Sequence, residues 1–244
     1  MTYIEGFVLA VPEGNKQAFV DHASDAFPLF EEYGVTRHAE CWEADVPDGK
    51  LTDFRRAVKA EAGEKIVFSW LEYPSKAVRD SAHEKMMADP RMEEMSEMPF
   101  DGMRMIYGGF DVIADRGTGQ KSAYVSGSLF AVPNDRKSDF TAFCEHMGGL
   151  FMDHGAGRVV DSWGTDVPEG KVTDFQRAVA LKDGESVAFT WIEWPSKEAS
   201  DKAWEKLMED PRMQEVEMPC DGKRMVFGGF EPVVNLFAKA GAKA

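Results

Sequence analysis

The chain has 244 residues, of which 43% are hydrophobic, and a formal net charge of −15 at pH 7. Such a chain can bury a normal core, and its acidic surface repels phosphates, so we expect neither nucleic acid nor an anionic membrane as a partner. No apolar stretch approaches the roughly 18–20 residues of a membrane span. The first 14 residues have no basic region and are typical of a strand rather than of a signal peptide.

In chain order, the first predicted element is a strand at Tyr3–Val11, which is rich in β-forming residues and ends at Pro12. Asn15 then suits the N-cap of a helix that runs to Tyr33, because the apolar residues of this segment recur at helical spacing. Pro28 lies inside the helix and predicts a kink or a division there.

A second strand is predicted at Val35–Ala44, followed by a turn at Asp45–Gly49, where proline fixes φ and glycine supplies a positive φ. The next segment, Thr52–Ala60, fits either a helix or a strand. Its later counterpart Phe175–Leu181 is followed by Lys182–Glu185, which is typical of a hairpin turn, and this favours a strand in both places.

The next strand is predicted at Ile66–Tyr73, and Ser75 suits the N-cap of a second helix that runs to about Met87. A short helical turn is expected around Arg91–Ser96. The last strand is predicted at Met103–Ile113, and its glycine pair indicates a bulge or a close backbone approach.

These elements occur twice, because the chain contains an internal repeat, and such a repeat sets the domain count. The segment Cys41–Val58, CWEADVPDGKLTDFRRAV, returns at Ser162–Val179 as SWGTDVPEGKVTDFQRAV, displaced by 121 positions. Late in each copy one residue is dropped, so Gly108–Phe110 returns at Gly228–Phe230. We expect two homologous domains at residues 1–116 and 123–234, a linker at 117–122, and a C-terminal tail at 235–244 that frays.

The predicted order of elements in each copy is therefore strand, helix, strand, a further strand, strand, helix, strand. This is a ferredoxin-like plan in the α+β class, with an antiparallel sheet and both helices on one face. The other sheet face needs cover, because an open apolar face would aggregate. The second copy supplies that cover most simply if the two sheets pack face to face.

Several blocks of the sequence resemble the YbaA-like family of uncharacterised bacterial proteins, namely Tyr3–Pro12, the block Asp45–Phe54, Trp70–Lys76, Asp89–Met92 and Met98–Phe110. The resemblance implies the dimeric α+β barrel superfamily. Members usually carry one such domain, so two copies in tandem imply that the barrel forms within one chain, as an intrachain pseudo-dimer. The family has no established catalytic residues, so none is carried over.

Four tryptophans are candidate ligand-binding residues: Trp42 and Trp163 before the two turns, and Trp70 and Trp191 on the strand Ile66–Tyr73 and its counterpart. Tryptophan can line an apolar pocket and donate its indole N–H. The competing interpretation places all four in the core of the barrel.

Two aspartates and two arginines recur in both copies and are further candidates. Asp45 and Asp166 could pair with Arg104 and Arg224, or act as acid and base if buried. The competing interpretation gives the aspartates a turn-initiating role and has each arginine bond the turn beside it.

The five histidines share no placement between the copies and no HxxxH or HxH spacing, so no metal or haem site is expected. The cysteines Cys41, Cys144 and Cys220 form no CxxC pair and occupy non-equivalent places, which argues against a zinc site or disulfide framework. They favour a reducing compartment, so we expect a cytoplasmic protein.

Two functional hypotheses remain, and neither requires a cofactor. In the first, the protein binds a small apolar molecule or is structural, without catalysis. In the second, it is a cofactor-independent enzyme, resembling an oxygenase or isomerase, acting on a small apolar substrate in a barrel pocket. A cavity of several hundred Å³ with a converging polar group would favour the second, whereas a filled, dry interior would contradict it.

Overall fold

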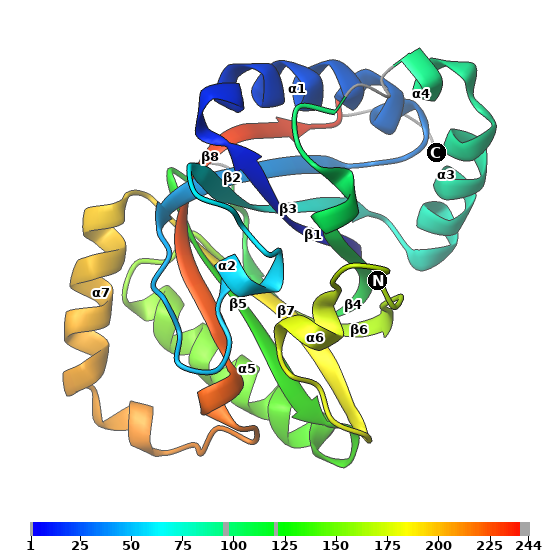
Figure 1. Ribbon diagram of the computed structural model, residues 1–244. Coiled ribbons are helices and arrows are strands. Elements are labelled where there is room, and N and C mark those ends of the chain that lie inside the picture. Colours follow the sequence, from blue (N-terminus) through cyan, green and yellow to red (C-terminus); the bar gives the residue numbers. More distant parts are fainter. Residues whose placement is uncertain (1, 95–97, 120–121, 240–244) are drawn as a thin grey trace.

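The computed structural model describes residues 2–94, 98–119 and 122–239 (Figure 1). The first copy contains β1 (Tyr3–Pro12), α1 (Lys16–Glu32), β2 (Arg37–Asp45), α2 (Phe54–Ala57), β3 (Glu64–Tyr73), α3 (Lys76–Ala88), α4 (Pro90–Glu94) and β4 (Ile106–Gly117). The second copy contains β5 (Tyr124–Pro133), α5 (Lys137–Asp153), β6 (Arg158–Asp166), α6 (Phe175–Ala178), β7 (Glu185–Trp194), α7 (Lys197–Glu209) and β8 (Val226–Phe237).

The strands of both copies close into one antiparallel barrel in the order β1-β3-β2-β8-β5-β7-β6-β4. Within each copy the order, β4-β1-β3-β2 or β8-β5-β7-β6, is that of a ferredoxin-like sheet. The copies are joined edge to edge by β2 with β8 and by β4 with β6. The prediction of an α+β barrel made within one chain is therefore confirmed.

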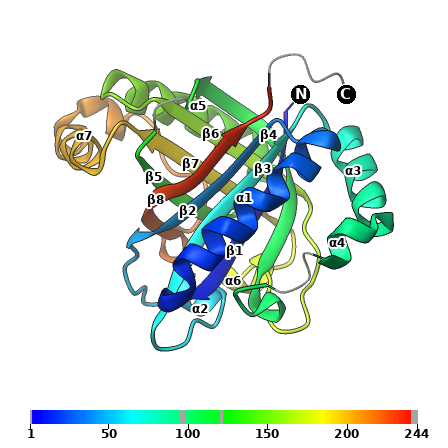
Figure 2. The same cartoon turned by 90° about the horizontal axis from the view of Figure 1, so that it is seen from above.

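The long helices cover the outside of the barrel. Figure 2 shows α1 crossing the outer face of β1, β2 and β3, with α3 beside it, while α5 and α7 lie on the opposite side of the molecule. Ser75 caps α3 as predicted, since its Oγ accepts the N–H of Val78 at 3.3 Å, and Ser196 caps α7 by accepting the N–H of Ala199 at 3.2 Å. The same local chemistry thus starts the second helix in both copies.

The preference for a strand at Thr52–Ala60 is wrong, because this segment contains the short helix α2. The physical reason is a helix cap: Asp53 accepts the N–H of Arg56 at 2.7 Å and also that of Gly49 at 3.1 Å. Phe54 then turns into the barrel and packs edge-on against Phe68, with ring centroids 5.8 Å apart.

The second copy contradicts the hairpin interpretation in the same way. Asp174 accepts the N–H of Arg177 at 2.7 Å and caps α6, which replaces the predicted strand at Phe175–Leu181. The turn at Lys182–Glu185 does exist, with Gly184 at φ 79°, but it connects α6 to β7 instead of joining two strands.

The first helix also departs from expectation. Helix α1 is continuous from Lys16 to Glu32 with Pro28 inside it, so the predicted division does not occur. Its buried face, which includes Phe19 and Phe27, is packed against the sheet, and this packing outweighs one lost hydrogen bond. Asn15 precedes the helix but makes no capping bond, and its Nδ2 instead donates to the carbonyl of Pro99 at 2.8 Å.

Two chain segments expected to be irregular belong to strands. Residues 235–237, assigned to a fraying tail, are part of β8, where Asn235 pairs with Ala39 and Phe237 with Arg37. Strand β4 likewise continues to Gly117, which pairs with Arg158. Both extensions exist because they pair with the other copy. Residues 240–244, and Met95 and Ser96 of the expected helical turn, lie outside the described residues.

The predicted glycine pair on the last strand does allow a close approach. A Cβ on Gly109 would overlap the Tyr3 hydroxyl, and the pairing of β4 with β6 shifts register between Gly109 and Phe110. The corresponding Gly229 meets the Tyr124 hydroxyl in the same way. The prediction of a bulge with close contact is confirmed in both copies.

Aromatic side chains from both copies fill the barrel interior. Phe68 and Phe189 stack with their ring centroids 4.5 Å apart, and Trp70 and Trp191 stack at 4.4 Å. These four side chains are almost fully buried. The interior is therefore a packed core, so a ligand cavity has to lie elsewhere in the fold.

Candidate functional site

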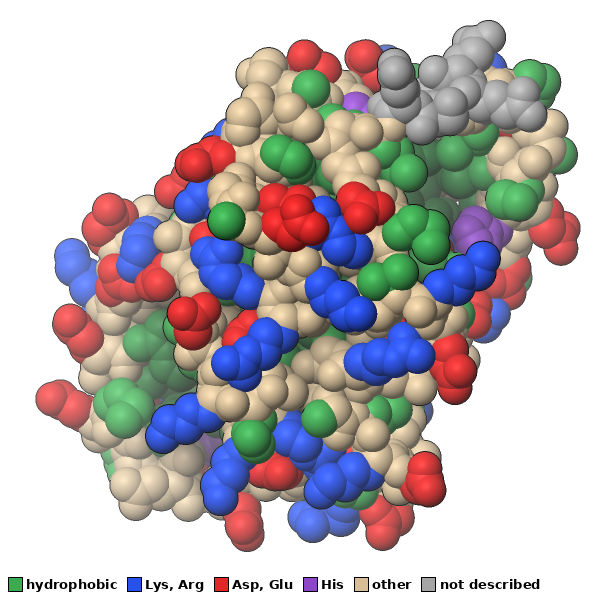
Figure 3. Space-filling view, in the orientation of Figure 1, with side chains coloured by type: hydrophobic (Ala, Val, Ile, Leu, Met, Phe, Trp, Pro, Cys, Tyr) green, Lys and Arg blue, Asp and Glu red, His purple; other side chains and the backbone are tan. Residues whose placement is uncertain are grey.

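Each copy has a cavity between the outer face of its sheet and its long helices. The first cavity, of about 760 Å³, lies under α1 and α3, and its apolar wall includes Phe7, Phe19, Ala26, Phe30 and Met86. Figure 3 shows hydrophobic side chains in a hollow between these two helices. The second cavity, of about 800 Å³, lies under α5 and α7.

Among the polar side chains that line the first cavity from the sheet, His38 and Glu40 of β2 and Ser69 of β3 contact one another. Residues two apart on a strand share a face, and Ser69 is the register partner of Glu40. Nε2 of His38 lies 2.8 Å from Oε1 of Glu40, and Oγ of Ser69 donates to Oε2. One carboxylate is therefore held by a hydrogen-bond donor at each oxygen.

His38 is fixed in place by the helix above it. The rings of Phe27 and Phe30 on α1 lie with their centroids 6.2 and 5.6 Å from the imidazole. Because the Glu40 carboxylate accepts, Nε2 carries the proton, and Nδ1 is buried without a hydrogen-bond partner among the described residues. His38 thus holds one oxygen of the Glu40 carboxylate.

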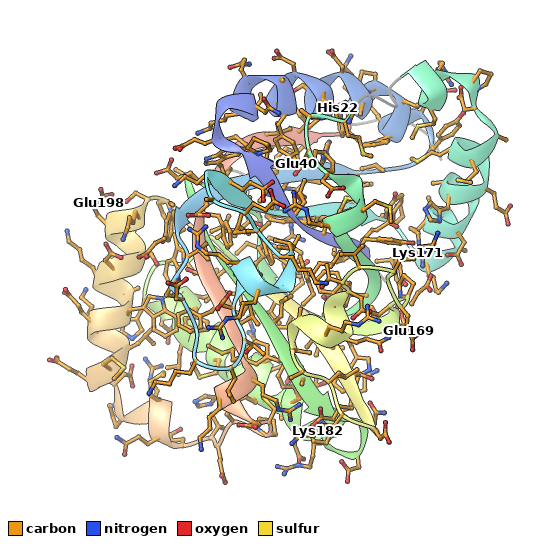
Figure 4. All side chains as sticks on the ribbon, in the orientation of Figure 1. His22, Glu40, Glu169, Lys171, Lys182 and Glu198 are labelled. Atoms are coloured by element: carbon orange, nitrogen blue, oxygen red, sulfur yellow. The ribbon has the colours of Figure 1, made fainter. Side chains whose placement is uncertain are left out.

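His22 on α1 lines the same cavity from the opposite wall. Figure 4 labels His22 on the helix and Glu40 on the strand beneath it. Burial lowers the pKa of His22, and the opposing attraction of Glu40 only partly offsets this effect. A neutral imidazole therefore lies across the cavity from the carboxylate at neutral pH.

A second carboxyl group lies in the cavity wall, at Glu5 of β1. Its pKa is raised by burial, while His83 and Arg79 favour the charged form. Tyr73 donates its hydroxyl to Glu5 at 3.3 Å, and burial also raises the pKa of this phenol. Glu5 and Glu40 are thus two carboxyl groups of the first cavity in different environments.

The second cavity keeps only part of this arrangement. Adding 121 to a number of the first copy gives its counterpart, so Glu40 becomes Asp161 and Ser69 becomes Thr190, and both line the second cavity. Burial raises the pKa of Asp161 to about 7, against a weaker opposing effect of its hydrogen bond with the Cys144 thiol. The carboxyl group is retained, but without the partner that His38 provides.

The histidines of the first cavity are all lost from the second. Their replacements are large or apolar side chains that line the second cavity, with His22 replaced by Phe143, His38 by Val159 and His83 by Trp204. The copies have therefore diverged in the walls of their cavities, while the barrel core keeps the same aromatic pairs. The first cavity is the candidate functional site.

The four tryptophans predicted from the sequence all lie in packed surroundings. Trp70 and Trp191 stack in the barrel and donate their indole N–H to Glu72 and Glu193, at 3.1 and 3.0 Å. Trp70 also reaches the wall of the first cavity. Trp42 and Trp163 pack against Phe19 and Phe140, with ring centroids 6.3 Å apart in both pairs.

The structure does not bring Asp45 or Asp166 together with Arg104 or Arg224. Arg104 binds Glu64 at 2.7 Å and Asp101 of its own turn at 2.8 Å, and Arg224 binds Glu185 and Asp221 in the same way, at 2.6 and 3.2 Å. Asp45 is exposed beside the second cavity, 3.9 Å from Lys197. Asp166 instead pairs with Arg79 of the other copy.

Lysine and arginine side chains gather on the face that carries α2 and α6 (Figure 3), although the chain is acidic overall. A hollow of about 390 Å³ there is lined by Arg56, Lys59, Lys171 and Arg177. Arg56 lies 3.2 Å from Asp53, and Arg177 lies 2.7 Å from Asp174. The aspartates that cap these helices offset part of the positive charge.

Within residues 2–94, 98–119 and 122–239, no group of three or more His, Cys, Asp or Glu side chains is arranged to hold a metal ion. Over the same residues, no helix is both long enough and apolar enough to cross a membrane. Cys41, Cys144 and Cys220 are free thiols, and the first two are buried.

The fold and the two cavities define the class of the protein, a dimeric α+β barrel formed within one chain. The chain belongs to the family described as "Protein of unknown function (DUF1428)", whose model matches residues 2–102 and 123–222. It is 63% identical over 116 residues to "Uncharacterized protein YbaA" of Escherichia coli (strain K12), an alignment covering 47% of this chain and 99% of that protein. The resemblance seen in the sequence is confirmed, and it carries no established function.

Solved structures agree on the fold. A "putative monooxygenase" from Lactobacillus acidophilus NCFM superposes with a TM-score of 0.59 at 11% sequence identity, covering 97% of this chain and 96% of that one. An "anthrone oxidase-like protein" superposes with a TM-score of 0.58 at 10% identity, covering 100% and 95%. At such low identity the similarity is one of fold alone.

Proposed function

We propose that the protein binds a small, largely apolar molecule in the first cavity. The observation that carries this proposal is a cavity of about 760 Å³ with apolar walls and one fixed carboxylate, Glu40, in its floor. Small-molecule sites typically have volumes of roughly 300–1,000 Å³, apolar walls and a few placed polar groups. A molecule with an aromatic or alicyclic body and one hydrogen-bond donor matches these features.

The ligand is assigned to the space under the helices because aromatic side chains fill the barrel interior. The stacked pairs Phe68–Phe189 and Trp70–Trp191 leave no comparable room between the sheets. Of the residues singled out from the sequence, Trp70 lines the proposed site, and the structure adds His22, His38, Glu40 and Ser69. Their convergence supports the first copy as the ligand-binding one.

Fluorescence titration with β-naphthol tests the proposal, because this probe has an apolar body and one hydroxyl donor. Ala26 lies in the wall of the first cavity, and Ala26→Trp should fill the space and weaken binding at least about tenfold, or ~1.4 kcal/mol. The matched control is Met147→Trp, at the equivalent position of the second cavity. Unchanged binding by a folded Ala26→Trp protein would rule out the first cavity as the site.

We further propose that the copies at residues 1–116 and 123–234 act as one unit in the cytoplasm and that nucleic acid is not a ligand. The free cysteines support a reducing compartment, and the net charge of −15 opposes phosphate binding. Fluorescence anisotropy with labelled duplex DNA at low salt tests the last point. A sub-micromolar, salt-dependent affinity, centred on the face of Arg56 and Arg177, would contradict it.

A further inference from the structure

We infer that the first cavity is a proton-transfer site in which Glu40 is the general base, acting on a weakly acidic C–H group of an apolar substrate. The inference rests on the proposed binding of such a molecule in this cavity. It makes the protein an enzyme of the isomerase type, and it assigns the reacting group to a residue that the sequence alone did not single out.

The geometry leaves Glu40 able to accept a proton. A carboxylate has about four lone-pair positions on its two oxygens, and His38 and Ser69 occupy one position on each oxygen. One position on each oxygen is left for a substrate. The Glu40 side chain retains 12% of its exposure and is part of the cavity wall, so a bound molecule can reach it.

The surroundings position the base before the substrate arrives. His38 packs against the rings of Phe27 and Phe30 and presents Nε2–H to the carboxylate. Ser69 fixes the other oxygen from the neighbouring strand. Because both donors sit on paired strands of a closed barrel, Glu40 needs little rearrangement when the reaction occurs. His38 and Ser69 are thus positioning residues.

The chemical step balances without a cofactor or an oxidant. A C–H bond next to a carbonyl or an equivalent electron-withdrawing group breaks, the proton moves to a Glu40 oxygen, and the electron pair moves into the withdrawing group. Return of the same proton to a different atom of the substrate completes an isomerisation and regenerates the carboxylate. His22, across the cavity, is placed to hydrogen-bond the charge that develops on the substrate.

A purely structural role does not account for this cluster. The second copy builds the same sheet with Val159 where the first copy has His38, and with Phe143 in place of His22. The fold therefore does not need these imidazoles for packing. Placing an ionisable pair such as His38 and Glu40 in an apolar wall costs desolvation free energy. Among the described residues, only the first copy contains such a histidine–carboxylate pair in its cavity.

The test uses the full chain and nitrobenzisoxazole, a small apolar probe with one acidic C–H bond. When a base removes that proton, the N–O bond breaks and a coloured nitrophenolate forms, so one absorbance trace reports the single step. General bases contribute typically 10²–10⁴-fold, and we expect Glu40→Gln to lower kcat/KM at least about 100-fold. Glu169→Gln, which changes an exposed loop carboxylate (Figure 4), should leave the rate unchanged.

Two further variants separate lost chemistry from lost folding. Glu40→Asp keeps a carboxylate and has the residue type of the second copy, so it should retain part of the activity that Glu40→Gln loses. His38→Val installs the residue of the second copy and should lower kcat more than it raises KM, whereas His38→Gln, which keeps a donor, should partly restore kcat. Thermal unfolding of each variant verifies that it is folded.

Competition with β-naphthol makes failure of the two proposals distinguishable. If nitrobenzisoxazole displaces β-naphthol but is turned over equally by the wild type and by folded Glu40→Gln, the general-base inference is wrong and the binding proposal stands. If Ala26→Trp does not weaken the binding of either probe, the binding proposal is wrong. The general-base inference is then wrong as well, because it depends on binding in this cavity.

Discussion

Arg37 of the first copy donates to Glu193 of the second, with Nη1 and Nη2 lying 2.7 and 2.9 Å from the two carboxylate oxygens. The equivalent pair, Arg158 and Glu72, makes the reciprocal contacts at 2.6 and 3.1 Å. All four side chains are buried. Each arginine therefore bonds the glutamate of the other copy, and the two bidentate pairs connect the halves of the barrel where β2 and β6 begin.

The first prediction concerns this connection. Replacing Arg37 by Met leaves the buried Glu193 without a close cation among the described residues, since Arg158 lies 3.9 Å away and the remaining close donor is the Trp191 indole N–H at 3.0 Å. Breaking a buried ion pair typically costs about 3–5 kcal/mol. We expect Arg37→Met to lower the free energy of unfolding by that amount in urea denaturation. Adding Glu193→Met should recover part of the loss, because no unpaired carboxylate remains.

A matched surface variant sets the scale for that measurement. Arg91 pairs with Glu32 at 3.0 Å, but both side chains are more than half exposed, so this pair should be worth about 1 kcal/mol or less. If Arg37→Met proves no more destabilising than Glu32→Gln, the buried pairs do not hold the copies together.

The second prediction concerns Trp42 and Trp163, the tryptophans that precede the two turns. Trp42 is 4% exposed and Trp163 is 5% exposed, each packed against a phenylalanine of the long helix in its copy. Truncation of a buried aromatic side chain costs about 3–5 kcal/mol. We expect either substitution by Ala to lower the urea midpoint by a corresponding amount. Unfolding curves identical to those of the wild type would contradict their place in the core.

The repeat made much of this fold predictable from the sequence. Two copies of one strand and helix pattern implied two equal sheets, and the need to cover their open faces implied the barrel. The local structure of Thr52–Ala60 was predicted less well, because the periodicity of this segment fits both a helix and a strand. The deciding contact, the cap by Asp53, depends on the backbone turning back toward Gly49. The strand at residues 235–237 could not be foreseen, since it depends on pairing with β2 of the other copy.

The candidate site was less predictable, for a related reason. His38 and Glu40 are two apart on a predicted strand, so their shared face was readable, but nothing local indicated that His22 and Ser69 would converge on them. The useful signal was the divergence between the copies at His22 and Phe143. The divergence can be assigned to a cavity wall only when the fold is known, because α1 must be seen to lie over β2.

The third prediction concerns the first copy alone, residues 1–116. In the full chain its edge strands β2 and β4 pair with β8 and β6. The fragment leaves both edges and the inner sheet face without partners, and such edges favour association with a second copy. We expect sedimentation at tens of micromolar to show a dimer or larger species, while the full chain stays monomeric. A well-folded monomeric fragment would show that the first copy folds and stays soluble without the second copy.

The last prediction concerns the buried carboxyl of the second cavity. The pKa of Asp161 is raised from 3.8 to about 7 by burial, so the folded protein binds this proton more tightly than the unfolded chain does. Its favourable contribution is complete below the unfolded pKa and is lost as the pH rises through about 7. Asp161→Asn, which cannot ionise, should therefore gain stability relative to the wild type between about pH 4 and about pH 8, by up to ~4 kcal/mol for a shift of about three pKa units. Thermal unfolding of both proteins at the two pH values measures the difference, and Asp183→Asn, in an exposed turn, serves as the control that should show none. If the stability difference between Asp161→Asn and the wild type stays constant across this range, folding does not raise the pKa of Asp161. The second cavity would then hold a charged carboxylate instead of a neutral acid.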